Sequence, residues 1–200
     1  MRLLLLFFFL FFNLFGADTK EYSFRVGYGV ASNNDLGEIL LLDFGSTKKD
    51  LSVVNIDGGY LLYKDTFDLP LDIYIKGGLS YFNEDQHDDV YEATLYIKFL
   101  YNLDFLDNRI RIGFGEGISY ADEVLEVEFD EESAEGGDTS KFLNYLDISF
   151  DFDVGRLVGY RPLEDVYLGY LLKHRSGVFG LYNGVHGGSN YNTIYIEANF

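Results

Sequence analysis

The chain has 200 residues, which suits a single domain, and it contains no cysteine, so disulfides, thiolate metal sites and a cysteine nucleophile are excluded. Its formal net charge of −18 argues against a nucleic-acid partner, because a phosphate backbone requires a basic surface. The 17 Tyr, 19 Phe and 22 Gly, with only 2 Pro and no Trp, favour strands over helices.

The first predicted element is an export signal at residues 1–17. A basic residue comes second, a long apolar run follows, and two small residues end at Ala17. This layout is typical of a secretory signal peptide that is cleaved near Ala17. The apolar run is shorter than the ~20 residues that span a bilayer, which disfavours the alternative of an uncleaved anchor. We therefore expect the mature domain to comprise residues 18–200.

The rest of the chain shows a strand-like alternation of side chains. From Tyr22 to Val30 the even positions are apolar or aromatic and the odd positions are small or charged, which is a period of two. The same pattern recurs along the chain, and the predicted strands cover residues 22–30, 51–63, 69–82, 90–103, 109–121, 142–155, 165–176 and 190–200. Eight strands are an even number, so we predict an all-β fold in which an antiparallel sheet closes into a barrel.

The row opposite the apolar one carries charges of both signs. Because so many charges can be buried only if they are paired, we place them in the lumen of a transmembrane barrel whose apolar face meets lipid. The predicted lumen set is Arg25, Asp57, Asp72, Lys76, Glu92, Lys98, Arg109, Arg111, Asp147, Asp151, Lys173, Arg175 and Glu197.

The end of the chain and the connections indicate where such a barrel resides and how it is oriented. The last strand alternates apolar residues up to Phe200 and resembles the C-terminal assembly signal of outer-membrane barrels, so we expect the bacterial outer membrane. Short connections near 64–69, 103–108 and 156–164 are assigned to the periplasmic side. The connections near 31–50, 84–89, 122–141 and 177–189 include the long, acidic ones and are assigned to the outside. The segment 36–45 fits a ninth strand, a hairpin extension or a short helix.

The seventh predicted strand carries a candidate catalytic pair. His174 and Ser176 continue the lipid-facing row of that strand near its outer end. Residues i and i+2 of a strand lie on one face, so the imidazole can reach the hydroxyl and act as its base. The alternative is that both are ordinary polar residues at the membrane interface.

The segment 170–200, which contains His-x-Ser near the end of the penultimate strand, resembles the C-terminal part of the lipid A 3-O-deacylase (PagL-like) family. The segments 113–123 and 144–155 are similar to relatives described as acyloxyacyl hydrolases. The resemblance implies an outer-membrane serine esterase that removes an ester-linked acyl chain from lipid A, the membrane anchor of lipopolysaccharide. It assigns His174 as the base and Ser176 as the nucleophile, and it requires neither a cofactor nor a metal.

Two positions depart from the family pattern. Asn190 stands where the family has its glutamate, and Gly177 stands where the family has an asparagine after the serine. Asn190 shares the parity of the lipid-facing row, so we expect it to orient His174 through a neutral hydrogen bond; its alternative role is turn polarity. The backbone N–H of Gly177 is the expected oxyanion donor. The other candidate donors are the N–H of Val178 and the side chains of Asn144 and Asn183.

Three further residues are candidates for a chemical role. Glu116 has lipid-facing parity and is the other candidate acid, although it lies two strands from His174. The alternative is that a bulge in its strand turns it into the lumen. His186, in the last outer connection, is an alternative base. His87 stands among aspartates, but the run lacks the spaced ligands and the glycine of a calcium loop, so we assign no metal site.

The second functional hypothesis is a small non-catalytic barrel with a structural or adhesive role. In this interpretation the acidic external loops bind ligands, and the polar residues at the outer rim meet only lipid head groups. The absence of the family glutamate favours it. No feature of the sequence specifies an oligomer.

Overall fold

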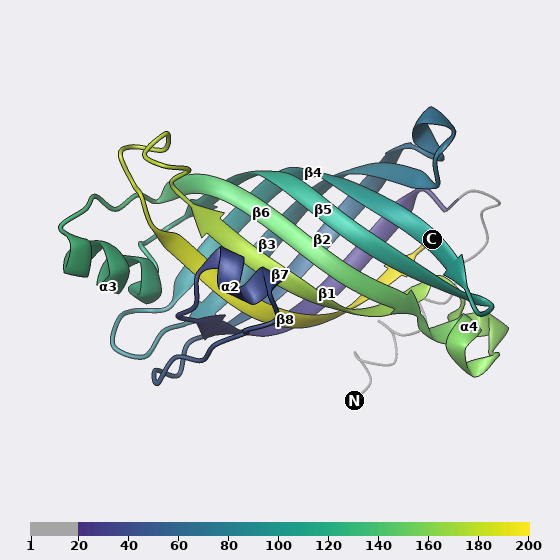
Figure 1. Cartoon of the computed structure of the whole chain (residues 1–200), viewed down its shortest axis with the longest axis horizontal. Helices are drawn as coiled ribbons and strands as arrows, with labels where there is room; N and C mark the ends of the chain where they lie inside the picture. Colours follow the sequence, from purple (N-terminus) through teal and green to yellow (C-terminus); the bar gives the residue numbers. More distant parts are fainter. Residues whose placement is uncertain (1–19) are drawn as a thin grey trace, which may run out of the picture.

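A computed structural model describes residues 20–200, which form a closed barrel of eight strands (Figure 1). The strands are β1 (Tyr22–Ser32), β2 (Ser52–Tyr63), β3 (Leu71–Asn83), β4 (Val90–Phe105), β5 (Asn108–Ala121), β6 (Phe142–Asp153), β7 (Val166–Ser176) and β8 (Gly188–Asn199). Each pairs antiparallel with its neighbours in the chain, and β1 also pairs with β8. The predicted fold is therefore confirmed. The expected signal segment, residues 1–17, lies outside the described residues.

The two faces of the sheet differ as the alternation predicts. In β1, Arg25 is 1% exposed, whereas the next outward residue, Val26, is 44% exposed. An apolar exterior around a charged interior is the arrangement of a transmembrane barrel. The predicted lumen charges are buried except Asp72 and Arg109, which lie near the end with the short turns and are partly exposed.

The lumen holds two groups of ion pairs. Asp147 of β6 binds Arg25 of β1 at 2.7 Å and also binds Lys98 of β4, so its carboxylate joins three strands. Arg25 also contacts Asp57 of β2 at 3.1 Å. A buried charge without a partner would cost several kcal/mol, so these positions depend on one another.

Further along the lumen the same principle recurs. Glu197 of β8 binds Lys76 and Arg111, and Arg111 also binds Asp151 at 2.7 Å. Nearer the mouth with the long connections, Glu92 binds Lys173 at 2.6 Å. The network therefore fills the barrel with paired side chains.

The helix α3 (Glu126–Glu135) stands at the end of the barrel that carries the long connections, which we take as the outer end (Figure 1). The sequence does not predict this helix in the acidic connection 122–141. Leu125, just before it, belongs to an apolar cluster inside the mouth, and Val127 packs against that cluster. The cluster consists of Ala31, Leu51, Val53, Phe82, Val90, Ala121, Leu125 and Tyr191. The mouth is thus sealed by apolar packing.

Acidic side chains attach α3 to the rim. Glu128 accepts a hydrogen bond from Ser189 at 2.7 Å and binds Arg175 at 2.9 Å. Glu132 accepts the N–H of His186 at 3.2 Å. These glutamates are therefore buried contacts, although an acidic loop is more often solvated.

The remaining elements are short. The helix α2 (Leu36–Leu40) settles the open segment 36–45 as a short helix followed by an irregular stretch. At the other end of the barrel are α4 (Val154–Val158) and two 3-10 turns, η1 (Thr66–Asp68) and η2 (Arg161–Leu163). No helix within residues 20–200 has the length and apolar character needed to cross a bilayer.

We expect Asp147→Ala to lower the free energy of unfolding by about 3–5 kcal/mol, because Arg25 and Lys98 lose a shared buried partner. The measurement is urea unfolding of the barrel in vesicles. The matched control is Asp104→Ala, because the Asp104 side chain is 59% exposed and pairs with Arg109 at the surface. That change should cost at most about 1 kcal/mol. Equal losses for the two variants would contradict the importance of the lumen network.

We expect the docking of α3 to weaken as the pH rises. Glu84, just beyond β3, is 7% exposed and accepts the N–H of Glu126 at 3.1 Å. Burial raises the pKa of Glu84 to about 7, and the neighbouring carboxylates of Glu126 and Glu128 act in the same direction. The folded state therefore holds this proton more tightly than the unfolded chain, so stability falls as the pH rises from about 4.5 through 7.

The measurement is hydrogen exchange of the α3 amides at about pH 5 and pH 8, corrected for intrinsic exchange rates. The equilibrium constant for the opening of α3, obtained from the corrected exchange rates, should increase with pH in the wild type. It should change less in Glu84→Gln, because the glutamine side chain cannot ionise. The same pH dependence in both proteins would exclude Glu84 as the responsible group.

Candidate functional site

His174 and Ser176 lie on the outer surface of β7. Their neighbours Lys173 and Arg175 are 2% and 1% exposed inside the lumen, so the alternation of the strand turns His174 and Ser176 outward. Ser176 is the last residue of β7, at the end of the barrel that carries the long connections. The pair is therefore at the outer edge of the lipid-facing wall.

Asn190 of β8 is the hydrogen-bond partner of His174. The two residues are opposite each other in the β7–β8 register, and Nδ1 of His174 lies 2.8 Å from Oδ1 of Asn190. The amide nitrogen of Asn190 donates to the carbonyl of Asn34 at 3.0 Å. Because the amide nitrogen is used there, its oxygen faces the imidazole, and Nδ1 must carry the proton. Nε2 of His174 is then left with a free lone pair, as a general base requires.

The hydroxyl of Ser176 makes no hydrogen bond with any residue in the range 20–200, His174 included. Both side chains occupy the same face of β7, where positions i and i+2 are about 7 Å apart. Hydrogen bonds between catalytic residues often tighten only when the substrate is bound. The geometry thus supplies an oriented imidazole beside an unengaged hydroxyl.

The expected oxyanion donor at Gly177 is not available in this conformation. The N–H of Gly177 donates to the carbonyl of Gly187 at 3.1 Å, because β7 and β8 extend their pairing into the connection between them. The side chain of Asn183 is also engaged, because its amide donates to Ser140 at 2.8 Å. The N–H of Val178 makes no hydrogen bond within residues 20–200, so it is the free donor nearest to Ser176 in the chain.

Glu116 and Asn144 extend the polar row onto the neighbouring strands. β5 pairs with β4 and with β6 without a register shift, so the bulge that would have turned Glu116 into the lumen is absent and that alternative is wrong. Glu116 is exposed on the outer wall and accepts a hydrogen bond from Asn144, which lies opposite Ser176 in the β6–β7 register. The sequence does not reveal the link through Asn144, because it depends on the register of three strands.

The other two histidines lie apart from this row. The ring of His87 packs edge-on against Phe129 of α3, with 5.3 Å between ring centroids. His186 is exposed in the connection between β7 and β8. Within residues 20–200, no three His, Asp or Glu side chains are grouped so that they could hold a metal ion.

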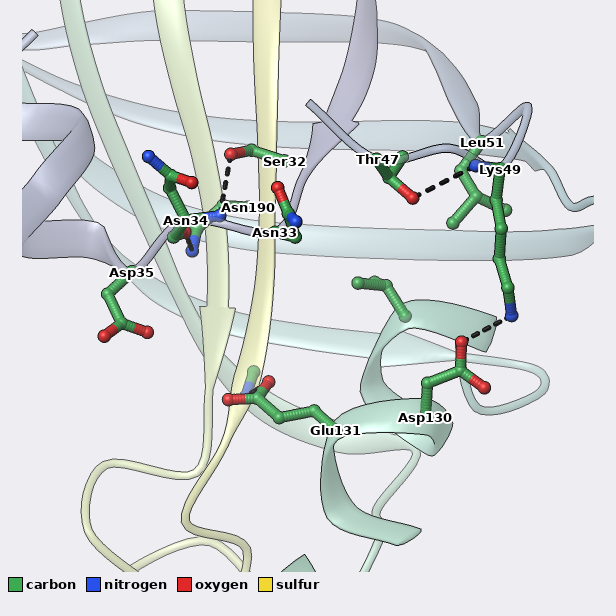
Figure 2. A pocket seen from close by; sticks show the side chains of 12 residues that line it. Ser32, Asn33, Asn34, Asp35, Thr47, Lys49, Leu51, Asp130, Glu131 and Asn190 are labelled. Atoms are coloured by element: carbon green, nitrogen blue, oxygen red, sulfur yellow. Dashed lines mark hydrogen bonds and ion pairs between the residues drawn. The ribbon is translucent and has the colours of Figure 1, made fainter. Parts of the chain in front are cut away.

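A pocket of about 350 Å³ lies next to Asn190, between the connection that follows β1, the start of β8 and α3 (Figure 2). Three carboxylates, from Asp35, Asp130 and Glu131, and one ammonium, from Lys49, line it. Lys49 is already bound by Glu126 at 2.6 Å and by Asp130. The other lining residues are Ser32, Asn33, Asn34, Thr47, Leu51, Val127, Gly188 and Asn190. The pocket therefore suits hydroxyl groups better than an anion.

Comparisons with known proteins show that the chain shares its fold with solved outer-membrane barrels, and they assign it to no family. No family model and no curated protein matches the chain. The structure of the outer membrane enzyme PagL superposes with a TM-score of 0.60 at 10% identity, covering 89% of this chain and 99% of that one. Neisserial surface protein A superposes with a TM-score of 0.51 at 13% identity, covering 91% and 98%. At these identities the likeness establishes the shared barrel fold alone.

We expect that in Asn190→Ala the ring of His174 is no longer restricted to the tautomer with a proton on Nδ1. In the wild type, the ¹⁵N chemical shifts of the His174 ring at neutral pH should report a protonated Nδ1, and the variant should show a mixture of the two tautomers. The matched control is Ile194→Ala, which shortens an outward side chain of β8 that is 67% exposed and leaves the bond between Asn190 and His174 in place. Tautomer populations that do not change in Asn190→Ala would show that Asn190 does not orient the ring.

Proposed function

We propose that the chain is a serine esterase of the bacterial outer membrane that removes an ester-linked acyl chain from lipid A. The observation that carries the proposal is the bond between His174 and Asn190 on the lipid-facing wall, which frees Nε2 of His174 beside the unengaged hydroxyl of Ser176. The export signal expected at residues 1–17 and the apolar exterior support the outer membrane as its location.

Each residue has a defined task in the reaction. The oxygen of Ser176 attacks the acyl carbonyl while its proton passes to Nε2 of His174. The ester C–O bond breaks, and His174 returns the proton to the departing sugar hydroxyl, leaving the acyl group on Ser176. A water molecule, deprotonated by His174, then releases the fatty acid and regenerates the serine. Asn190 holds the ring through Nδ1 during both halves.

The surroundings of the site support a lipid whose ester is attached to a sugar. The outer wall of β6 beside Ser176 is apolar and partly exposed at Leu146 and Ile148, and each buried methylene of an acyl chain gains about 0.8 kcal/mol by leaving water. The pocket beside Asn190 offers amides and carboxylates, which hydrogen-bond sugar hydroxyls. The site thus has an apolar side for the chain and a polar side for the head group.

The comparison with PagL supports the proposal, because PagL is an outer membrane enzyme with the same barrel fold. Neisserial surface protein A, also a barrel, is named for its location at the surface. The barrel fold is therefore compatible with both of the functions that the sequence suggests, and the decision rests on His174 and Ser176.

The second candidate is a non-catalytic barrel whose acidic outer loops bind a surface ligand. Two observations favour it. A neutral amide, Asn190, stands where the resembling family has a glutamate, and the N–H of Gly177 is engaged by Gly187. A barrel of this kind would leave lipid A unchanged.

We expect outer membranes that contain the wild-type protein to lose one ester-linked acyl chain from lipid A, as measured by mass spectrometry. Ser176→Ala should abolish the loss, and His174→Ala should slow it by about 10²–10⁴-fold, because the general base is removed. Ser133→Ala is the matched control, because it removes an exposed hydroxyl from α3 and should retain full activity. Unchanged lipid A with folded wild-type protein would refute the esterase and favour the binding barrel.

A further inference from the structure

The connection between β1 and β2 lies against the outer wall of the barrel instead of projecting from its rim. The amide of Asn192 in β8 donates to the carbonyl of Phe44 at 2.8 Å, and the ring of Phe44 packs edge-on against Tyr170 of β7 at 5.5 Å. Asn190 holds the same connection through the carbonyl of Asn34 at 3.0 Å. In Figure 1, α2 accordingly lies over the side of the barrel near β7 and β8.

This segment, residues 36–44, covers part of the lipid-facing wall, and we call it the flap. Leu172 faces outward by the alternation of β7, yet it is only 1% exposed. Ile39 of α2 is 2% exposed. By contrast, Ile194, an outward residue of β8, is 67% exposed. The inner side of the flap is therefore packed as tightly as a protein core.

The other side of the flap is apolar and uncovered. Leu40, Leu41 and Leu42 are 52%, 84% and 76% exposed, and Phe44 is 42% exposed. A consecutive run of exposed large apolar residues is unfavourable in water. Because the flap lies on the wall, this run adds to the apolar exterior of the barrel.

We propose that the flap is immersed in the outer leaflet of the membrane, where lipid acyl chains cover Leu40–Leu42 and Phe44. The position along β7 supports this partner, because β7 has 11 residues, about the length that a tilted strand needs to cross the hydrocarbon core, and Tyr170 lies within it. Asp43, between the leucines and Phe44, is exposed, and its carboxylate must reach the head groups. The flap therefore lies in the outer part of the leaflet, with the leucines among the acyl chains.

The flap also bears on the candidate site. The carbonyl of Asn34 holds the amide of Asn190, and Asn190 in turn holds His174. Lipid that keeps the flap in place would thereby keep the imidazole oriented. This last consequence rests on the proposed esterase function, whereas the immersion itself does not.

The absence of tryptophan from the chain allows a direct test. Leu41→Trp places a single fluorophore on the flap, and the protein is folded into phosphatidylcholine vesicles with or without brominated acyl chains, which quench only immersed fluorophores. Phe114→Trp is the control for the lipid-facing wall, since Phe114 is 47% exposed on β5. Phe179→Trp is the control for water, since Phe179 is 92% exposed in the connection after β7. Unheated electrophoresis verifies that each variant is folded.

We expect brominated chains to quench Leu41→Trp about as strongly as Phe114→Trp, with emission at shorter wavelength than that of Phe179→Trp. Quenching of Leu41→Trp closer to that of Phe179→Trp would overturn the proposal. Leu42→Trp provides an independent second position, and it replaces Leu41→Trp if that variant does not fold. No outcome depends on enzymatic activity, so a failed esterase assay leaves the result interpretable.

Discussion

The pairing of β1 with β8 is the constraint on which the rest of the structure depends. A strand in hydrocarbon has no water to satisfy its backbone groups, so the sheet must close on itself. Closure with eight strands gives a narrow interior that side chains must fill. In this chain, ion pairs between charged side chains, such as those of Asp147 and Glu197, occupy that interior. The strict inward alternation that builds the network also fixes which side chains face outward. His174, Ser176 and Asn190 face lipid because their strand neighbours are committed to the lumen.

The strands can be predicted from the sequence because a period of two is a local signal. Each strand of the structure overlaps its expected range, and the charged set lies on the predicted face. The connections are less predictable, because their conformation depends on contacts between distant parts of the chain. The helix α3 consists largely of acidic residues, and its glutamates are buried by Arg175, Ser189 and the backbone of the last connection. Nothing in residues 122–141 alone specifies those partners.

In the candidate site, too, some features follow from the local sequence pattern and others depend on contacts between distant segments. The common outward face of His174 and Ser176 follows from parity, and the opposition of His174 and Asn190 follows from the register of adjacent strands. The carbonyl that fixes the orientation of the Asn190 amide belongs to Asn34, which is 156 positions away, and no local pattern points to it. The expected oxyanion donor is also engaged by a distant residue, because the N–H of Gly177 donates to the carbonyl of Gly187 in the hairpin. The pocket beside Asn190 is assembled from three separate segments, so only the folded chain reveals it.

The packed interior of the barrel decides whether ions and small solutes can pass through this protein. Leu125 and Phe82 are fully buried within the apolar cluster beneath α3, and the ion pairs of Lys173 with Glu92 and of Arg175 with Glu128 lie at the same end of the lumen. The interior of an eight-stranded barrel is only wide enough for side chains to fill, so in a planar bilayer the barrel should carry no ionic current. Small solutes should not permeate through it. A ligand can therefore reach only the outer wall and the connections of this barrel.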